Sequence, residues 1–275
     1  MRTACHWTGC VLLVVVLSEL PVASGAPFLP DFDAATFAAD SSVSDNPYLP
    51  LVPGTIYTYE GREVGNGQTT LSRTFVTFEN KEILGVQARV VRDIEFADGL
   101  LAEDTRDFFA RDTAGNVWYM GEATMAFEYD EEGNLIGTST EGSWEAGVDD
   151  ASPGFIMEAN PAVGDNYYQE FAPNNDALDQ AAVVSLDETV SIDLGTFTNV
   201  LQTLETTELD PDARELKYYA PGVGLVFTEE DLDENLMNPQ FLVELVSVEV
   251  IPAPAALSLV VVGLGAAGWF RRRFR

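Results

Sequence analysis

Short runs of β-branched, aromatic and alternating residues recur along most of this 275-residue chain. Residues 73–78 have the sequence Arg-Thr-Phe-Val-Thr-Phe, and residues 86–90 alternate apolar with polar side chains. Both patterns are typical of strands with one buried face. The same texture returns at residues 181–186, 197–204 and 241–250. Between residues 26 and 250 no stretch sustains the helical apolar period of about 3.6 residues, so no long helix is predicted there.

Tight-turn sequences separate these runs at short intervals. Glycine and asparagine favour such turns because they tolerate positive φ, and proline presets the φ of a turn residue. Short strands joined by tight turns predict an all-β domain over residues 46–250, folded as an antiparallel barrel or sandwich. The turn sequences are Gly65-Asn66-Gly67, Asp98-Gly99, Gly115-Asn116, Gly133-Asn134 and Pro221-Gly222.

Two neighbouring segments share an Asp-x-x-Gly-Asn-apolar pattern. It occupies residues 112–117 and again residues 130–135. Since two copies are too few for a repeat array, the pattern predicts two hairpins with the same turn.

The flanks of the β-rich region have a different composition. Residues 26–45 are rich in Asp, Ala and Ser and contain Pro27 and Pro30, which predicts a loose acidic lead-in. Residues 229–239 are acidic and predict a loop or one helical turn before the last strand.

The N-terminus has the three parts of a secretory signal peptide, predicted over residues 1–25. Arg2 gives a thin positive region, residues 11–17 are apolar, and small residues at 23–25 suit a cleavage site. Cleavage is predicted between Gly25 and Ala26. The alternative is an uncleaved anchor, but the apolar part is too short to span a bilayer.

The C-terminus carries an uncharged apolar run over residues 255–270, which ends in an arginine cluster. A helix begun at Pro252 has 19 residues, about 28 Å long, close to the thickness of a hydrocarbon core of about 30 Å. The pattern predicts a transmembrane helix with a cytoplasmic C-terminus, because such clusters stay inside. A buried core helix is the alternative. The basic tail is Arg271, Arg272, Arg273 and Arg275.

With Pro252, Ala253 and Pro254 before that helix, residues 251–275 resemble the PEP-CTERM sorting domain of Gram-negative bacteria. The resemblance implies export, anchoring in the inner membrane, processing by an exosortase-like enzyme after signal peptidase has acted, and a final place at the cell surface or in the extracellular matrix. Ala253 stands where the family usually has Glu. This departure leaves the processing enzyme open, and a plain C-terminal anchor is the alternative.

Acidic residues outnumber basic ones by 45 to 14. Removing residues 1–25 and 255–275 takes away Arg2, Glu19 and the four terminal arginines, so residues 26–254 hold 44 acidic and 9 basic side chains, a net charge of −35. This charge argues against nucleic acid as a partner, because phosphate contacts require positive charge. It suits a cation-rich exterior, where weak Ca²⁺ binding is one hypothesis.

The chain's only cysteines and histidine are Cys5, Cys10 and His6, all within the predicted signal peptide. The rest of the chain therefore excludes disulfides, histidine-assisted nucleophiles, and typical zinc or copper sites. Carboxylate chemistry, binding of hard cations or no chemistry at all are left. We assign no catalytic residue, no metal ligand and no cofactor from the sequence.

Several acidic groups and aromatic residues are weak site candidates. Abundant acids make chance pairs common, so the group at 103–107 predicts a polar strand face, and Glu141 and Glu145 merely flank Trp144. The spacing at 231–235 begins like a calcium loop, but positions six and twelve are leucine. The aromatics favour a core over a sugar-binding platform; they are Trp118, Tyr119, Trp144, Tyr167 and Tyr168.

Residues 46–61, 142–147 and 218–226 together resemble a group of uncharacterised secreted bacterial β proteins, a likeness that brings no site residues. The sequence thus predicts an exported surface or matrix protein with a structural or binding role, with an extracellular polysaccharide as one candidate partner. The alternatives are a carboxylate-based glycan-active enzyme and a carrier of a lipid or another apolar ligand.

Overall fold

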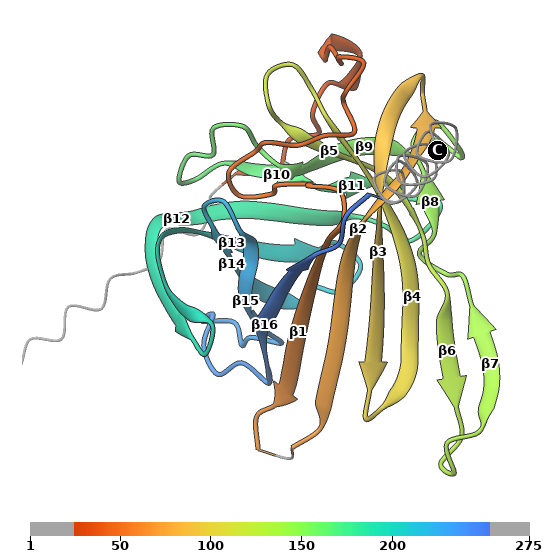
Figure 1. Ribbon diagram of the computed structural model, residues 1–275, viewed down its shortest axis with the longest axis vertical. Coiled ribbons are helices and arrows are strands. Elements are labelled where there is room, and N and C mark those ends of the chain that lie inside the picture. The colour runs from red at the N-terminus through yellow and green to blue at the C-terminus, as the bar shows by residue number, and fades with distance from the viewer. Residues whose placement is uncertain (1–24, 66, 254–275) are drawn as a thin grey trace, which may run out of the picture.

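Strands make up nearly all of the regular structure in the computed structural model, which describes residues 25–65 and 67–253 (Figure 1). Among these residues the 3-10 turn η1 (Phe32–Ala34) is the only helical segment, and no helix could span a bilayer. The strands are β1 (Thr55–Glu63), β2 (Thr69–Ile83), β3 (Val86–Ala97), β4 (Leu100–Arg111), β5 (Val117–Ala123), β6 (Ala126–Tyr129), β7 (Leu135–Ser139), β8 (Trp144–Glu145), β9 (Ser152–Met157), β10 (Asn166–Tyr168), β11 (Glu170–Phe171), β12 (Asp179–Ile192), β13 (Gly195–Thr207), β14 (Arg214–Ala220), β15 (Gly224–Glu230) and β16 (Phe241–Val250).

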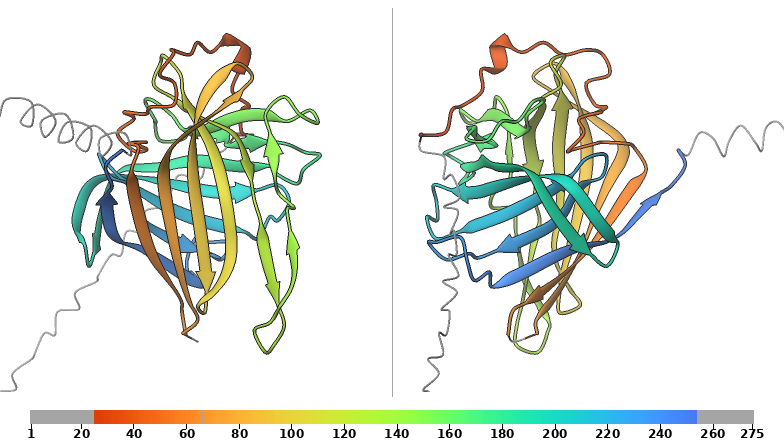
Figure 2. Two further views of the ribbon diagram at one scale, coloured as in Figure 1. Left: turned by 45° about the vertical axis from the view of Figure 1, so that its right-hand side comes forward. Right: turned by 90° about the vertical axis from the view of Figure 1, so that its left-hand side faces the viewer.

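The predicted all-β antiparallel fold is confirmed, and it takes the form of a nearly closed barrel. The sheet follows the order β12-β13-β14-β15-β16-β1-β2-β3-β4-β5-β9, in which β16 joins the two halves by pairing with β1. The ring is closed by residues 166–171, which contain β10 and β11. In this segment β10 pairs with β12 at one edge of the sheet, and β11 pairs with β9 at the other. Strands β12–β15 cross behind β1–β4 at a large angle (Figures 1 and 2).

All five runs predicted as strands lie within strands. Residues 73–78 and 86–90 lie in β2 and β3, residues 181–186 and 197–204 lie in β12 and β13, and residues 241–250 are β16 itself. In the acidic segment 229–239, the first two residues end β15 and the rest forms a loop, which was one of its two predicted forms. Local patterning therefore located the main strands correctly.

The two related hairpins are also confirmed, and their turns are built alike. Asp112 Oδ1 accepts from the Asn116 backbone N–H at 2.9 Å, and Asp130 Oδ1 accepts from that of Asn134 at 2.7 Å. In each turn the asparagine side chain also donates to the aspartate, at 2.8 Å and 3.0 Å. The shared pattern is a structural turn motif.

Inward-facing side chains divide the interior of the barrel into two halves. At the end where β16 leaves the barrel, the interior is an apolar cluster that includes Val76, Phe109 and Leu245. Toward the β1–β2 and β3–β4 turns, which we call the hairpin end, the same inward positions become acidic. Because one strand face recurs every second residue, β3 passes from buried Val91 to Asp93.

Residues 26–45 pack against the outside of the barrel, which corrects the prediction of a loose lead-in. The Phe32 ring lies edge-on to the Trp118 ring, with centroids 5.3 Å apart. The buried Arg89 guanidinium donates to the Ser42 carbonyl oxygen at 3.0 Å. Composition missed this docking because the apolar contacts come from isolated residues rather than from a periodic run.

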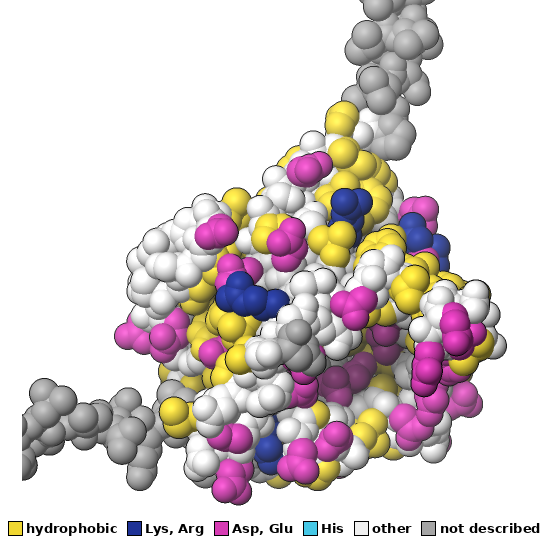
Figure 3. All heavy atoms as spheres, turned by 90° about the horizontal axis from the view of Figure 1, so that it is seen from below, with side chains coloured by type: hydrophobic (Ala, Val, Ile, Leu, Met, Phe, Trp, Pro, Cys, Tyr) yellow, Lys and Arg dark blue, Asp and Glu magenta, His cyan; other side chains and the backbone are white. Residues whose placement is uncertain are grey.

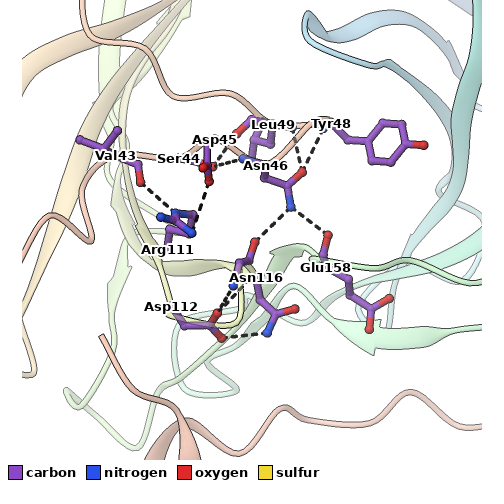
Figure 4. A network of polar contacts seen from close by, with 11 residues as sticks. Val43, Ser44, Asp45, Asn46, Tyr48, Leu49, Arg111, Asp112, Asn116 and Glu158 are labelled. Atoms are coloured by element: carbon purple, nitrogen blue, oxygen red, sulfur yellow. Dashed lines mark hydrogen bonds and ion pairs between the residues drawn. The ribbon is translucent and has the colours of Figure 1, made fainter. Parts of the chain in front are cut away.

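Asn46 ties the start of the domain to two distant segments (Figure 4). Its Nδ2 donates to the carbonyl oxygens of Gly115 at 3.2 Å and Glu158 at 2.9 Å, while its Oδ1 accepts from the Tyr48 N–H at 2.9 Å. Asn46 is only 3% exposed. The segment 46–61 therefore begins with a residue that stabilises the fold.

Candidate functional site

Acidic side chains line the interior of the barrel at its hairpin end. Seen from this end the surface is hollowed, and acidic side chains gather in the hollow (Figure 3). The inward positions of β3, β4 and β5 surround a cavity of about 210 Å³ there. We call its five acids the front wall: Asp93, Glu95, Glu103, Asp107 and Glu122.

A second cavity of about 280 Å³ adjoins the first at the hairpin end. Both cavities are lined by Ser72 and Glu95. The second adds the carboxyl group of Glu230 from β15 and an apolar side made by Ala97, Phe241 and Val243. We call these two adjoining cavities the lumen, and acids line both of them.

The opposite side of the lumen, which we call the rear wall, carries its own cation. Asp179, Glu205 and Glu215 line a small cavity with Lys217. The Lys217 Nζ lies 2.7 Å from Glu205 Oε2 and 3.2 Å from Glu215 Oε2. Burial acts to lower the pKa of Lys217, but the two carboxylates outweigh it and raise that pKa well above its ordinary value.

Each wall has one pair of glutamates directly opposite one another on neighbouring strands. Glu205 faces Glu215 in the rear wall, and Glu95 faces Glu103 in the front wall. Like charges in such positions repel. Lys217 relieves the rear pair, whereas among the described residues no ion pair reaches either glutamate of the front pair.

Asp93 has an oxygen that is buried without a partner. Its Oδ2 accepts from the Thr74 hydroxyl at 2.9 Å. Its Oδ1 is buried and has no hydrogen-bond partner of normal geometry within the described part of the chain. Unpaired buried acceptors are costly. Asp93 lines the first cavity, but this oxygen itself is closed off from it.

Tyr119 links two acids of the front wall. Its hydroxyl lies 2.7 Å from Asp107 Oδ1 and 2.9 Å from Glu122 Oε2. Burial raises the pKa of Asp107 well above its ordinary value, and the charges of Asp93 and Glu122 add to the effect. Burial also raises the pKa of Glu122 to about 7. Some carboxyl groups of the front wall are therefore protonated near neutral pH.

The same effect extends around the lumen. Burial raises the pKa of Glu230 to about 7 and that of Asp93 above its ordinary value. Burial also raises the pKa of Glu170 to about 9, while the Trp144 Nε1–H donates to its Oε2 at 2.6 Å. Glu170 is therefore neutral at pH 7, and its side chain packs in the interior without adding a negative charge.

The residues predicted to direct processing lie at the limits of the described chain. Gly25 and Ala26 are exposed, as are Pro252 and Ala253 just after β16. Pro254 and the basic tail, Arg271, Arg272, Arg273 and Arg275, lie outside the described residues, as do most of the predicted signal peptide and the predicted transmembrane helix.

Strand alternation divides the acidic group predicted as one polar face. Glu103 and Asp107 point into the lumen. Asp104 points outward and pairs with Arg92, with 2.6 Å between Arg92 Nη2 and Asp104 Oδ2. The second predicted acid pair has no shared site either, since Glu145 binds the Lys81 ammonium at 2.6 Å.

Three of the candidate aromatics are core residues, as favoured by the sequence. Trp118, Trp144 and Tyr167 are each less than 5% exposed. In the calcium-like segment, Asp233 Oδ1 instead accepts from the backbone N–H groups of Asn235 and Met237. Within residues 25–65 and 67–253, no group of three or more acidic side chains is arranged to hold a metal ion.

Sequence reasoning missed most of the lumen. The available signal was a period of two among acids, as in Asp93 and Glu95 or Glu103 and Asp107, in phase with apolar residues farther along the same strand. An acidic face of this kind normally points to solvent, and only closure of the barrel turned it inward.

No protein-family model matches this chain, and no curated protein matches its sequence. Two solved structures are similar to it in outline. A candidate lipoprotein of Parabacteroides distasonis has a TM-score of 0.45 and 16% identity, with 74% of this chain and 99% of that one covered. A candidate exported protein with a YmcC-like fold from Bacteroides fragilis has a TM-score of 0.40 and 14% identity, with 74% and 98% covered. Similarity at this level carries no information on ligands or chemistry.

Proposed function

We propose that this chain is an exported binding protein whose barrel lumen takes an organic cation. The front wall carries this proposal, because it gathers five acids around a cavity whose lining residues include no lysine or arginine. An ammonium or guanidinium group inserted there would relieve the repulsion among these carboxylates.

An organic cation fits this lumen better than a bare metal ion. The acids are spread over three strands, and no group of them within the described residues is arranged as a metal site. N–H donors can reach separated acceptors one at a time. The apolar side chains of the adjoining cavity offer contact for a hydrocarbon part.

Export and sorting complete the proposal. The signal-like N-terminus and the PEP-CTERM-like tag support export, action of signal peptidase, and handling by an exosortase-like enzyme at exposed Pro252 and Ala253. The last described residues follow β16 at the end of the barrel opposite the hairpin end, where the lumen lies (Figure 1). An anchored protein would therefore point its lumen away from the membrane.

Intact-mass measurement of the protein from its native host tests the sorting half. We expect a mass that lacks residues 1–25 and the apolar C-terminal run. A mass that still includes residues 255–275 would leave a plain membrane anchor in place of release to the surface or matrix.

Calorimetric titration with n-butylamine tests the binding half, with n-butanol as the uncharged control ligand. We expect heat of binding from the amine alone, and a loss of affinity of about tenfold or more in Glu103→Gln, since a charge-assisted contact is lost. The matched variant Glu131→Gln removes an exposed acid from the β6–β7 turn and should bind like the parent. Equal losses in both variants would reduce the effect to general charge attraction and refute the site.

The glycan-active alternative has one observation in its favour. Asp107 and Glu122 share the Tyr119 hydroxyl, and the pKa of Glu122 is raised to about 7, as general acids require. The lining of the first cavity, where these two acids lie, however contains no aromatic ring on which a sugar could stack, and the ring in the lining of the second cavity is that of Phe241. We therefore expect no hydrolysis of chromogenic glycosides. Hydrolysis that the Glu122→Gln variant lacks would instead favour a glycan-active enzyme over a cation-binding protein.

A further inference from the structure

We infer that two copies of this chain form a dimer in which the β6–β7 hairpin of each copy enters a groove on the outer face of the other. We call residues 126–139, which form this hairpin, the ribbon. The inference goes beyond the proposed function, because the side chains that carry it point away from the lumen.

The ribbon stands off the barrel beside β4 and carries exposed apolar side chains (Figures 1 and 2). Within the described chain, β6 pairs with β4 at Ala126 alone, opposite Glu103, and β7 pairs only with β6. Leu135 and Ile136 of β7 are 55% and 65% exposed. Edge strands are normally covered or protected by charged side chains, so this apolar edge is suited to a partner.

A groove of about 650 Å³ lies on the outer face of β1–β3 at the hairpin end. Because Ser72 lines the lumen, its neighbours Leu71 and Arg73 point to the outside. Leu71 lies opposite Phe96 on β3, and these two half-buried side chains give the groove an apolar floor. Arg62 and Arg73 are exposed at its sides. The other lining residues are Glu60, Gly61, Thr69, Thr70 and Gly99.

The charges of the groove and of the ribbon are complementary. Among the described residues Arg73 has no ion pair, and Arg62, whose side chain is 62% exposed, has one of 3.5 Å to Glu244. The ribbon carries the exposed acids Glu128 and Glu132. Arginine binds carboxylates through paired hydrogen bonds. A ribbon seated in the groove would thus meet the arginines with its acids and the apolar floor with its leucine and isoleucine.

A second copy is the partner that these surfaces favour, because one chain supplies both of them side by side. A Cβ atom added to Gly133 in the turn of the ribbon would lie 3.9 Å from Leu100 Cδ1. Leu100 directly follows Gly99, which lines the groove. Two copies related by a two-fold axis can therefore place each ribbon in the other's groove at the same time, which closes the pair as a dimer.

The net charge of the chain weakens this pairing without preventing it. Residues 26–254 carry a net charge of −35, so two copies repel each other at long range. At about 0.15 M salt, charges more than about 8 Å apart are largely screened, whereas contacts inside the groove are not.

Sedimentation velocity over a range of protein concentrations, at about 0.15 M salt, tests the inference. We expect a monomer–dimer equilibrium, and Ile136→Ser and Arg73→Gln should each raise its dissociation constant about tenfold or more. The matched controls are Val163→Ser, at a residue 50% exposed between β9 and β10, and Arg214→Gln, at the start of β14. Both controls should dimerise like the parent.

Charge reversal tests which surfaces meet. One variant combines Arg62→Glu with Arg73→Glu in the groove, and the other combines Glu128→Arg with Glu132→Arg on the ribbon. Each variant alone should stay monomeric, because its groove and ribbon carry the same charge. A mixture of the two should form mixed dimers, since each ribbon then meets a groove of opposite charge.

Three outcomes would overturn the dimer: a monomer at every concentration, association that Ile136→Ser and Arg73→Gln leave unchanged, or a mixture of the reversed variants that stays monomeric. Binding of n-butylamine should be the same in Ile136→Ser as in the parent, because Ile136 lies outside the lumen. The dimer and the cation-binding function therefore stand or fall separately.

Discussion

Glu170 illustrates, at the scale of one residue, how burial in this barrel raises the pKa of an acidic side chain. It is 6% exposed and sits against the Trp144 indole. Its pKa rises from an ordinary 4.5 to about 9, and the pKa values of Glu122 and Glu230 rise to about 7. Such groups hold their protons in the folded state and release them on unfolding at neutral pH.

Folding stability should therefore fall as the pH rises. The folded state binds more protons than the unfolded state between about pH 4.5 and pH 9 at Glu170, and between about pH 4.5 and pH 7 at Glu122 and Glu230. Within its own window each group lowers the free energy of unfolding by up to about 1.4 kcal/mol per pH unit. We expect the melting temperature to be higher at pH 5 than at pH 8. Thermal unfolding followed by circular dichroism across this range measures the slope.

Glu170→Gln provides the specific test of that slope. Glutamine keeps the shape and an acceptor for the Trp144 N–H but has no proton to lose, so the variant should be more stable than the parent at pH 8 and less dependent on pH. Glu131→Gln, which alters an exposed acid, should leave the slope unchanged. Stability that rises from pH 5 to pH 8 would contradict the assignment of neutral interior acids.

At the scale of elements, strands and turns were predictable because their causes are local. Gly115 and Asn116 adopt a tight turn that Asp112 fixes, and the same sequence gives the same turn at Asp130. The docking of residues 26–45 was not predictable, since it depends on where Trp118 and Arg89 lie in the folded barrel. Periodicity locates elements, whereas contacts between them depend on the closed fold.

The two related turns allow a matched measurement. Asp112 is 5% exposed, and its Oδ2 also accepts from the Trp118 Nε1–H at 3.0 Å, whereas Asp130 serves only its own turn at the surface. Asp112→Ala should lower the free energy of unfolding by about 2 kcal/mol or more, because it leaves buried donors unpaired. Asp130→Ala should have a much smaller effect. Urea denaturation compares the two, and equal losses would contradict the role given to Asp112.

At the scale of the whole molecule, the open question was which strand face would be enclosed. Asp93 and Glu95 alternate with Arg92 and Ile94 along β3, so the strand alone could have turned either face to solvent. Closure through β10 and β11 fixed the choice and turned the acids inward. The same closure separates an apolar interior near the exit of β16 from the acidic lumen at the hairpin end.

A crystal structure of the protein with bound n-butylamine, at pH 8, tests the central claim most directly. The account predicts one ammonium nitrogen inside the front wall, within hydrogen-bond distance of Glu95 and Glu103, just as Lys217 Nζ lies between Glu205 and Glu215 on the rear wall. An amine bound only on the outer surface, with the lumen holding water alone, would contradict it.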